Sequence, residues 1–192
     1  GAIDAVILAG GRGTRMNGAD KGLLTLDGEP LVVQVASRLR PQVAALVVNA
    51  NRNAETYAQL VGAPVVADAW PDFRGPLAGI CAGFAATTAP WLLAVPADMP
   101  GLPRDLAAQL YAGRGTARAV YAEIAGDAVY PLCLLHRDLA ADLHASVARG
   151  ELAVRRWLAR QDAMAVAIRG WDAVPVNLNT PEALAAAQSQ AR

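Results

Sequence analysis

Apolar runs and amphipathic stretches alternate along the first half of the chain. Short runs of aliphatic residues predict buried strands at residues 3–8, 45–48, 64–67 and 91–95. Apolar residues recur at helical spacing over residues 31–39, 54–61, 76–88 and 104–111. Strands that alternate with helices in this way predict a parallel sheet with right-handed crossovers. A shorter strand is predicted over residues 23–26, closed by the turn dipeptide Asp27-Gly28.

In the second half the predicted strands follow one another more closely. Residues 119–124 and 129–135 flank Gly126-Asp127 and predict a hairpin, which adds an antiparallel element to the edge of the sheet. The remaining elements are helices over 139–147 and 151–160, strands over 164–168 and 174–178, and a final helix that starts at Thr180-Pro181-Glu182. We therefore predict an α/β fold, a single Rossmann-like three-layer domain over residues 1–192 with a mostly parallel sheet.

The composition is that of a globular domain without a strongly charged surface. Hydrophobic residues make up 54% of the chain, charged residues 18%, and the formal net charge is +0. A neutral chain is not expected to bind nucleic acid through phosphate contacts. Cys81 and Cys133 lie in apolar settings that predict buried thiols rather than a disulfide. No signal peptide or bilayer-length apolar run is visible, so we expect a cytoplasmic protein without a membrane partner.

A glycine-rich loop follows the first predicted strand. Glycines at positions 10, 11 and 13 leave the backbone open to a ligand, and Arg12, Arg15 and Lys21 add cationic donors. This combination suits a polyphosphate. The Walker A pattern fails because Lys21 precedes Gly22, and the dinucleotide fingerprint fails because Met16 stands where its third glycine would be. The alternative interpretation is a glycine-rich turn without function.

Polar side chains follow the other predicted parallel strands where each strand ends. Asn49, Asp68 and Asp98 occupy these positions, and parallel strands bring such ends to one edge of the sheet. One or two carboxylates suffice for Mg²⁺ bound to a nucleotide, and we select Asp98 as the ligand because Pro96 and Pro100 stiffen its loop. The alternative is structural in each case, since Asn and Asp commonly end strands and turns.

Two further amides occur near the end of the chain. Strand alternation places Asn177 and Asn179 on one face. They could bind phosphate or a metal-bound water, or they could cap the final helix that follows.

A series of short motifs resembles the molybdenum cofactor guanylyltransferase family over most of the chain. The motifs occur in the order Leu8-Ala9-Gly10-Gly11, Asp20-Lys21-Gly22-Leu23-Leu24, Asn49-Ala50-Asn51-Arg52, Gly75-Pro76-Leu77-Ala78-Gly79, Pro96-Ala97-Asp98-Met99-Pro100 and Asn177-Leu178-Asn179-Thr180-Pro181-Glu182. The resemblance implies a nucleotidyltransferase of the glycosyltransferase-A-like, nucleotide-diphospho-sugar transferase type. Such an enzyme joins GMP from GTP to the terminal phosphate of molybdopterin and releases pyrophosphate.

The resemblance also implies roles for single residues. In such an enzyme, the backbone of Leu8, Ala9 and Gly10 holds base and phosphates, and Gly11 completes the Gly-Gly pair of the guanylyl form. The remaining roles are phosphate contact by Lys21, nucleoside contact by Asn49 and Asp68, Mg²⁺ binding by Asp98, and second-substrate contact by Asn177 and Asn179. Because two polyanions must meet, we expect Lys21 and Arg15 to draw charge toward the leaving pyrophosphate.

The chain departs from the family pattern in the half that the resemblance assigns to the pterin. Tyr130-Pro131 stands where His-Pro is frequent. Leu152-Ala153 follows Gly150-Glu151 where an arginine pair is frequent, and Arg155 and Arg156 could substitute from the next helical turn.

Two rival functions remain open at this point. One is a sugar-phosphate or cytidylyl-type nucleotidyltransferase, because the glycine loop also resembles that of sugar-phosphate enzymes. The other is a non-catalytic carrier that binds nucleotide or cofactor and hands it to a partner. The expected partners are GTP and molybdopterin as substrates, with a molybdoenzyme or cofactor-delivery protein as a further possibility.

Overall fold

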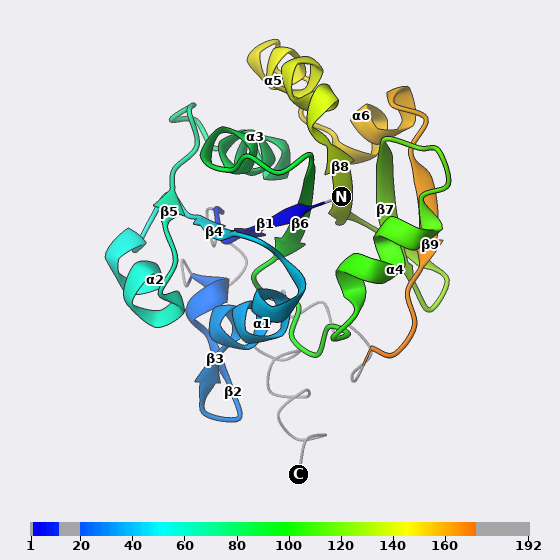
Figure 1. Cartoon of the computed structure of the whole chain (residues 1–192). Helices are drawn as coiled ribbons and strands as arrows, with labels where there is room; N and C mark the ends of the chain where they lie inside the picture. Colours follow the sequence, from blue (N-terminus) through cyan, green and yellow to red (C-terminus); the bar gives the residue numbers. More distant parts are fainter. Residues whose placement is uncertain (1, 12–19, 172–192) are drawn as a thin grey trace.

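The computed structural model describes residues 2–11 and 20–171, which form an α/β structure around one large sheet (Figure 1). The strands follow the spatial order β5-β4-β1-β6-β8-β7-β9. Their bounds are β1 Ile3–Leu8, β4 Leu46–Asn49, β5 Val65–Val66, β6 Trp91–Pro96, β7 Ala119–Ile124, β8 Asp127–His136 and β9 Met164–Ala167. The predicted strand over 174–178 and the final helix lie outside the described residues.

The sheet is mostly parallel, as predicted, but its antiparallel strand is internal. Strand β1 pairs in parallel with β4 and β6, and β4 with β5. Strand β8 runs antiparallel to both β6 and β7, and β7 pairs in parallel with β9. The expected position of the antiparallel element at the edge is therefore wrong. Strand β8 lies between β6 and β7 and runs antiparallel to both, so β7 has the same direction as β6. Strand β9 can therefore pair with β7 in parallel after a helical crossover.

Helices cover both faces of the sheet and make three layers. One face carries α1 (Leu31–Leu39), α2 (Ala54–Val61) and α4 (Leu106–Gly113). The other carries α3 (Pro76–Ala86), α5 (Ala140–Ala148) and α6 (Val154–Arg160), which lie together at the top of Figure 1. Alternate strand residues supply the two cores, because successive side chains point to opposite faces.

The smaller elements differ from the predicted strand at 23–26. A 3-10 helix covers Lys21–Leu23, and β2 (Thr25–Leu26) pairs with β3 (Glu29–Pro30) in a separate two-stranded hairpin. Two further 3-10 helices cover Arg40–Gln42 and Arg137–Leu139. The turn at Asp27-Gly28 closes the β2–β3 hairpin, with both residues at positive φ.

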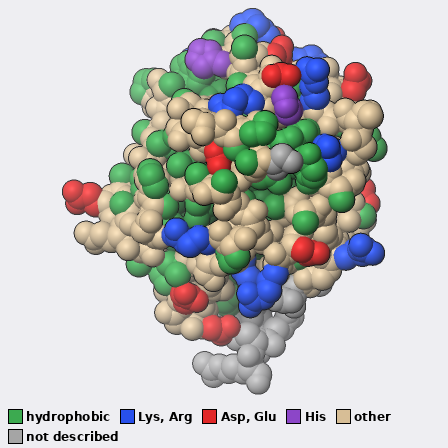
Figure 2. Space-filling model, in the orientation of Figure 1, with side chains coloured by type: hydrophobic (Ala, Val, Ile, Leu, Met, Phe, Trp, Pro, Cys, Tyr) green, Lys and Arg blue, Asp and Glu red, His purple; other side chains and the backbone are tan. Residues whose placement is uncertain are grey.

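Charged side chains of both signs are spread over the surface, and the helices are short. On the face shown in Figure 2, basic and acidic side chains are interspersed. Within the described part of the chain, no helix is both long and apolar enough to cross a bilayer.

Candidate active site

The ends of β1, β4 and β6 meet at one edge of the sheet. Leu8 is paired with Asn49 on one side and with Pro96 on the other. The Ala9 amide donates to the Asn49 carbonyl at 2.8 Å, and the Ala97 amide donates to the Leu8 carbonyl at 3.0 Å. The beginning of the glycine loop therefore lies directly between Asn49 and the segment that carries Asp98.

Asn49, Asn51 and Asp68 form a network at this edge. The amide nitrogens of Asn49 and Asn51 donate to the two carboxylate oxygens of Asp68, at 2.8 and 2.9 Å. The Asp68 amide donates back to the side-chain oxygen of Asn51 at 2.9 Å. Asn49 is buried, and its amide also donates to the Val66 carbonyl at 3.2 Å. The three side chains are thus fixed in orientation by one another.

Glycines allow the Asn49 side chain to occupy this position. A Cβ at position 10 would lie 2.9 Å from the Asn49 side-chain oxygen. A Cβ at position 79, in the first turns of α3, would overlap the same oxygen and lie 2.9 Å from Leu8 Cδ2. Residue 79 therefore has to be glycine for α3 to approach the ends of β1 and β4 this closely.

Lys21 and Asp98 belong to neighbouring segments. Gly22 packs on the segment after β6, because a Cβ there would lie 3.2 Å from Ala97 Cβ and 2.6 Å from the Tyr57 hydroxyl oxygen. The Tyr57 hydroxyl donates to the Asp20 carboxylate, which also accepts from the Asn53 amide at 3.2 Å. Lys21 precedes Gly22 and Asp98 follows Ala97, so the close approach of Gly22 to Ala97 brings the backbone of Lys21 and Asp98 to the same edge.

The charges of two acidic groups act on Tyr57 at this edge. Burial, first of all, raises the pKa of Tyr57 well above its ordinary value, and its hydrogen bond to Asp20 raises that pKa further. The charge of Asp98 acts in the same direction, whereas that of Arg52 opposes it. Tyr57 therefore remains a neutral hydrogen-bond donor at physiological pH.

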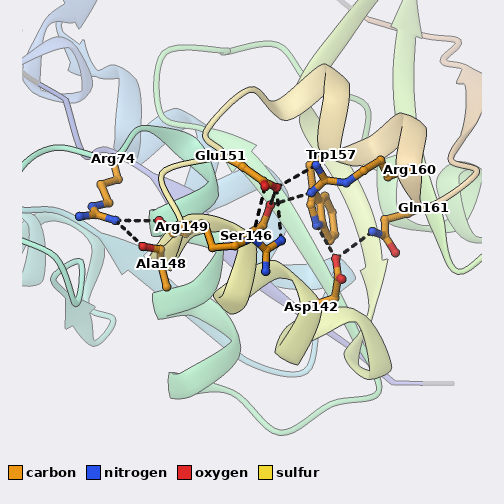
Figure 3. A network of polar contacts seen from close by, with 10 residues as sticks. Arg74, Asp142, Ser146, Ala148, Arg149, Glu151, Trp157, Arg160 and Gln161 are labelled. Atoms are coloured by element: carbon orange, nitrogen blue, oxygen red, sulfur yellow. Dashed lines mark hydrogen bonds and ion pairs between the residues drawn. The ribbon is translucent and has the colours of Figure 1, made fainter.

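A depression of about 250 Å³ adjoins the network, lined by Asn51, Ala67, Asp68, Trp70, Pro71 and Phe73. The loop between β5 and α3, which lines this depression, is hydrogen-bonded to α5. Arg74 donates to the carbonyls of Val147 at 2.7 Å and Ala148 at 3.3 Å, as Figure 3 shows. The Trp70 ring packs on His144 with centroids 5.0 Å apart.

The donor set at the edge fits a metal held mainly by a nucleotide. Within residues 2–11 and 20–171, no cluster of three or more acidic, histidine or cysteine side chains could hold an ion by itself. Asp98 is half-buried and follows Ala97, whose amide donates to the Leu8 carbonyl. Mg²⁺ commonly takes one or two protein carboxylates and completes its shell with phosphate and water.

The cysteines are free, as predicted. Cys133 is fully buried and Cys81 is half-buried. Burial raises the pKa of each thiol to about 12, and the nearby charge of Asp68 adds to the effect at Cys81. Both thiols therefore stay protonated and weakly reactive.

The structure brings most of the predicted site residues together. Leu8, Ala9, Gly10, Asn49 and Asp68 are linked by direct contacts, and the segments of Lys21 and Asp98 adjoin them. Gly11 continues the same exposed loop. Arg15, Asn177 and Asn179 lie outside the described residues.

Sequence reasoning missed several residues of this edge. Asn51 follows Asn49 by two positions, a spacing that places both on one face of an extended segment and that could have indicated a pair. Tyr57 matched the apolar face of a helix, so its hydroxyl contact with Asp20 gave no signal. Gly79 was part of a motif, but only the fold reveals its contact with Asn49.

The antiparallel half carries the departures from the family pattern. A network at the junction of α5 and α6 holds Glu151: its carboxylate accepts from the buried Ser146 at 3.1 Å and pairs with Arg149 and Arg160 (Figure 3). These contacts, led by the hydrogen bond from Arg149, lower the pKa of Glu151 to about 2. Arg155 and Arg156 are exposed on the first turn of α6.

The sequence matches a known protein family over most of its length. The family model described as MobA-like NTP transferase domain matches residues 5–165. A molybdenum cofactor guanylyltransferase of Serratia proteamaculans is 45% identical over 181 residues, which cover 94% of this chain and 91% of that protein. A Burkholderia vietnamiensis protein of the same name is 46% identical over 195 residues, covering 96% and 95%.

Solved structures share the fold at low sequence identity. Molybdopterin-guanine dinucleotide biosynthesis protein A from Archaeoglobus fulgidus aligns with a TM-score of 0.78 at 22% identity, covering 98% of both chains.

Proposed function

Because the chain belongs to the MobA-like NTP transferase family, as a nucleotidyltransferase of molybdenum cofactor biosynthesis, we propose that it transfers GMP from GTP to the terminal phosphate of molybdopterin. The observation that carries the proposal is the shared edge of β1, β4 and β6. There the glycine loop, the Asn49–Asp68 network and the Asp98 segment are in direct contact. We further propose that residues 1–192 form one domain.

The parallel half binds the nucleotide in this proposal. The backbone of Leu8 to Gly11 faces base and phosphates, and Asn49 and Asp68 contact the nucleoside. Their mutual hydrogen bonds support this role, because groups that are already oriented lose little freedom when the ligand binds. Asn51 acts through Asp68 as a positioning residue.

The reaction requires charge neutralisation rather than a strong base. A terminal phosphate oxygen of molybdopterin attacks the α-phosphorus of GTP, the bond to the α–β bridging oxygen breaks, and pyrophosphate leaves with that oxygen. Asp98 would hold Mg²⁺, which neutralises charge on the triphosphate when bound. Lys21 and Arg15 attract the leaving pyrophosphate, and the edge holds the reacting groups in line.

The test is pyrophosphate release in the presence of Mg²⁺. The wild-type chain is offered GTP or CTP, each with molybdopterin or with glucose 1-phosphate. We expect release with GTP and molybdopterin and little with the other pairs. Release with a sugar phosphate or with CTP would replace the proposal by another nucleotidyltransferase activity. GTP binding without any release would indicate a carrier.

A further inference from the structure

Strand β8 contains a break in its pairing with β7. Tyr121 is opposite Cys133, but the next residue of β7, Ala122, is opposite Val129. The segment from Tyr130 to Leu132 is therefore left out of the ladder. Bulges of this kind re-aim side chains and are frequent beside active sites.

The bulge lies at the edge that holds the proposed nucleotide site. Cys133 is opposite Ala94 of β6, and β8 runs antiparallel to β6. This pairing with β6 ends at Ala94 and Cys133, so the residues that precede Cys133 lie beyond it, in the direction of the end of β6 that leads to Asp98. Tyr130 is thus placed on the strand next to the one that leads into Asp98.

The same face of the sheet carries Tyr121 and the nucleotide residues. Pairing runs across the sheet through Val47, Val6, Ala94, Cys133 and Tyr121. Leu8 and Asn49 are each two residues further along their strands, so they lie on this face as well. It is the face covered by α3, α5 and α6 (Figure 1).

Tyr121 and Tyr130 form a tyrosine pair at this position. Their ring centroids are 5.0 Å apart with the planes tilted by 45°, and both side chains are half-buried. Within the described part of the chain, neither hydroxyl has a hydrogen-bond partner. The pair therefore offers a partly exposed aromatic surface and two polar groups that a ligand could engage.

We propose that Tyr130, supported by Tyr121, stacks on the flat bicyclic ring of the acceptor substrate. The inference rests on the proposed function, because it needs an acceptor with such a ring. Strands β1 and β8 are separated by two strand spacings, about 10 Å. That separation leaves room for the phosphates between the nucleoside, held at β1 and β4, and a ring that lies on Tyr130.

The experiment compares Tyr130→Leu, Tyr130→Phe and Tyr121→Leu with the wild type. For Tyr130→Leu we expect the KM for molybdopterin to rise about tenfold, while the KM for GTP changes less than about twofold. Tyr130→Phe keeps the ring and should stay within about threefold of the wild type. Tyr121→Leu removes only the support and should give an intermediate rise in the molybdopterin KM.

Tyr111→Leu is the matched control, because Tyr111 packs against Trp91, at the opposite end of β6 and on the face covered by α4. It should leave the KM for molybdopterin unchanged. Equal molybdopterin KM values for the wild type and Tyr130→Leu overturn the inference. If GTP binding is lost as well, Tyr130→Phe decides, since a tenfold rise there excludes stacking.

A binding measurement separates this inference from the proposed function. Free pterin is titrated with protein and followed by its own fluorescence. Binding that Tyr130→Leu weakens supports the stacking role even where the wild type releases no pyrophosphate. Absence of pterin binding to the wild type, or equal binding to both proteins, overturns the inference even where turnover is normal.

Discussion

The two halves of the sheet differ in the hydrogen bonds that their polar side chains make near the edge where β1, β4 and β6 end. In the parallel half, Asn49, Asn51 and Asp68 hold one another through hydrogen bonds of 2.8–2.9 Å. In the antiparallel half, Tyr130 has a ring contact with Tyr121, and the polar network lies behind, where Glu151 joins α5 and α6. Preorganised groups suit a ligand of fixed shape. The polar side chains of the first half are therefore oriented by one another, whereas Tyr121 and Tyr130 in the second half contact each other only through their rings.

The comparison predicts that the largest loss of activity comes from the junction of the halves. Asp98→Ala removes the carboxylate that we assign to Mg²⁺, so pyrophosphate release should fall at least about a hundredfold. The fold should persist, because Asp98 is half-buried on a loop. Asp138→Ala is the control: this exposed aspartate pairs with Arg118 at the opposite edge, and its loss should leave turnover intact. Unchanged turnover in Asp98→Ala would remove Asp98 from the mechanism.

The second prediction tests whether the parallel half depends on close packing at Asn49. Gly79→Ala places a methyl group on the Asn49 side chain and should weaken GTP binding about tenfold, about 1.4 kcal/mol. Overpacking of this kind also destabilises the fold by about 1–3 kcal/mol. Equilibrium GTP titration and thermal unfolding measure the two effects separately.

Gly83→Ala provides the matched control in the same helix. A Cβ at position 83 would lie 2.8 Å from Val6 Cβ, in the core and away from Asn49. This variant should lose stability by a similar amount but bind GTP like the wild type. If both variants weaken GTP binding equally, the effect belongs to α3 as a whole and not to the contact with Asn49.

Most of the fold could be predicted because its signals are local. Apolar periodicity located β1, α1 and α2 to within a residue, and Pro76 marked the start of α3. The internal position of β8 could not be predicted, because strand order depends on pairing between distant segments. Pro131 inside the predicted strand 129–135 was a signal for a bulge, because proline cannot donate to a ladder, but the position of the break depends on the pairing with β7.

The candidate site divides in a similar way. The sequence predicted that Asn49, Asp68 and Asp98 lie at strand ends on one edge of the sheet, because parallel strands bring their ends together. The contacts that orient them, from Asn51 and Gly79, depend on loops whose conformation carries no simple pattern. Roles for these residues therefore rest on the proposal and its tests.

The third prediction concerns the hydrogen bonds that connect the loop between Asp68 and α3 to the end of α5. Arg74 connects this loop to the carbonyls at the end of α5, and its side chain is 23% exposed. Arg74→Ala should raise the KM for GTP about threefold with kcat nearly constant, because the loop carries Asp68 but no reacting group. Arg74→Lys should recover part of the loss, since one donor can still reach a carbonyl. Arg118→Ala, an exposed arginine at the far edge, should change neither constant.

The smallest effect is expected from the network behind the antiparallel half, and it should depend on pH. Glu151 has its pKa lowered to about 2, mainly by the hydrogen bond from Arg149, and the carboxylate is 44% exposed. A depressed pKa stabilises the fold above the ordinary carboxyl value of about 4.5, and this contribution is lost as the pH falls toward 2. Glu151→Gln should therefore lower Tm by only about 1–2 °C at pH 7. The difference from the wild type should shrink on acidification below pH 4.5, whereas a difference that stays constant down to pH 2 would trace the effect to packing around Ser146 instead of to charge.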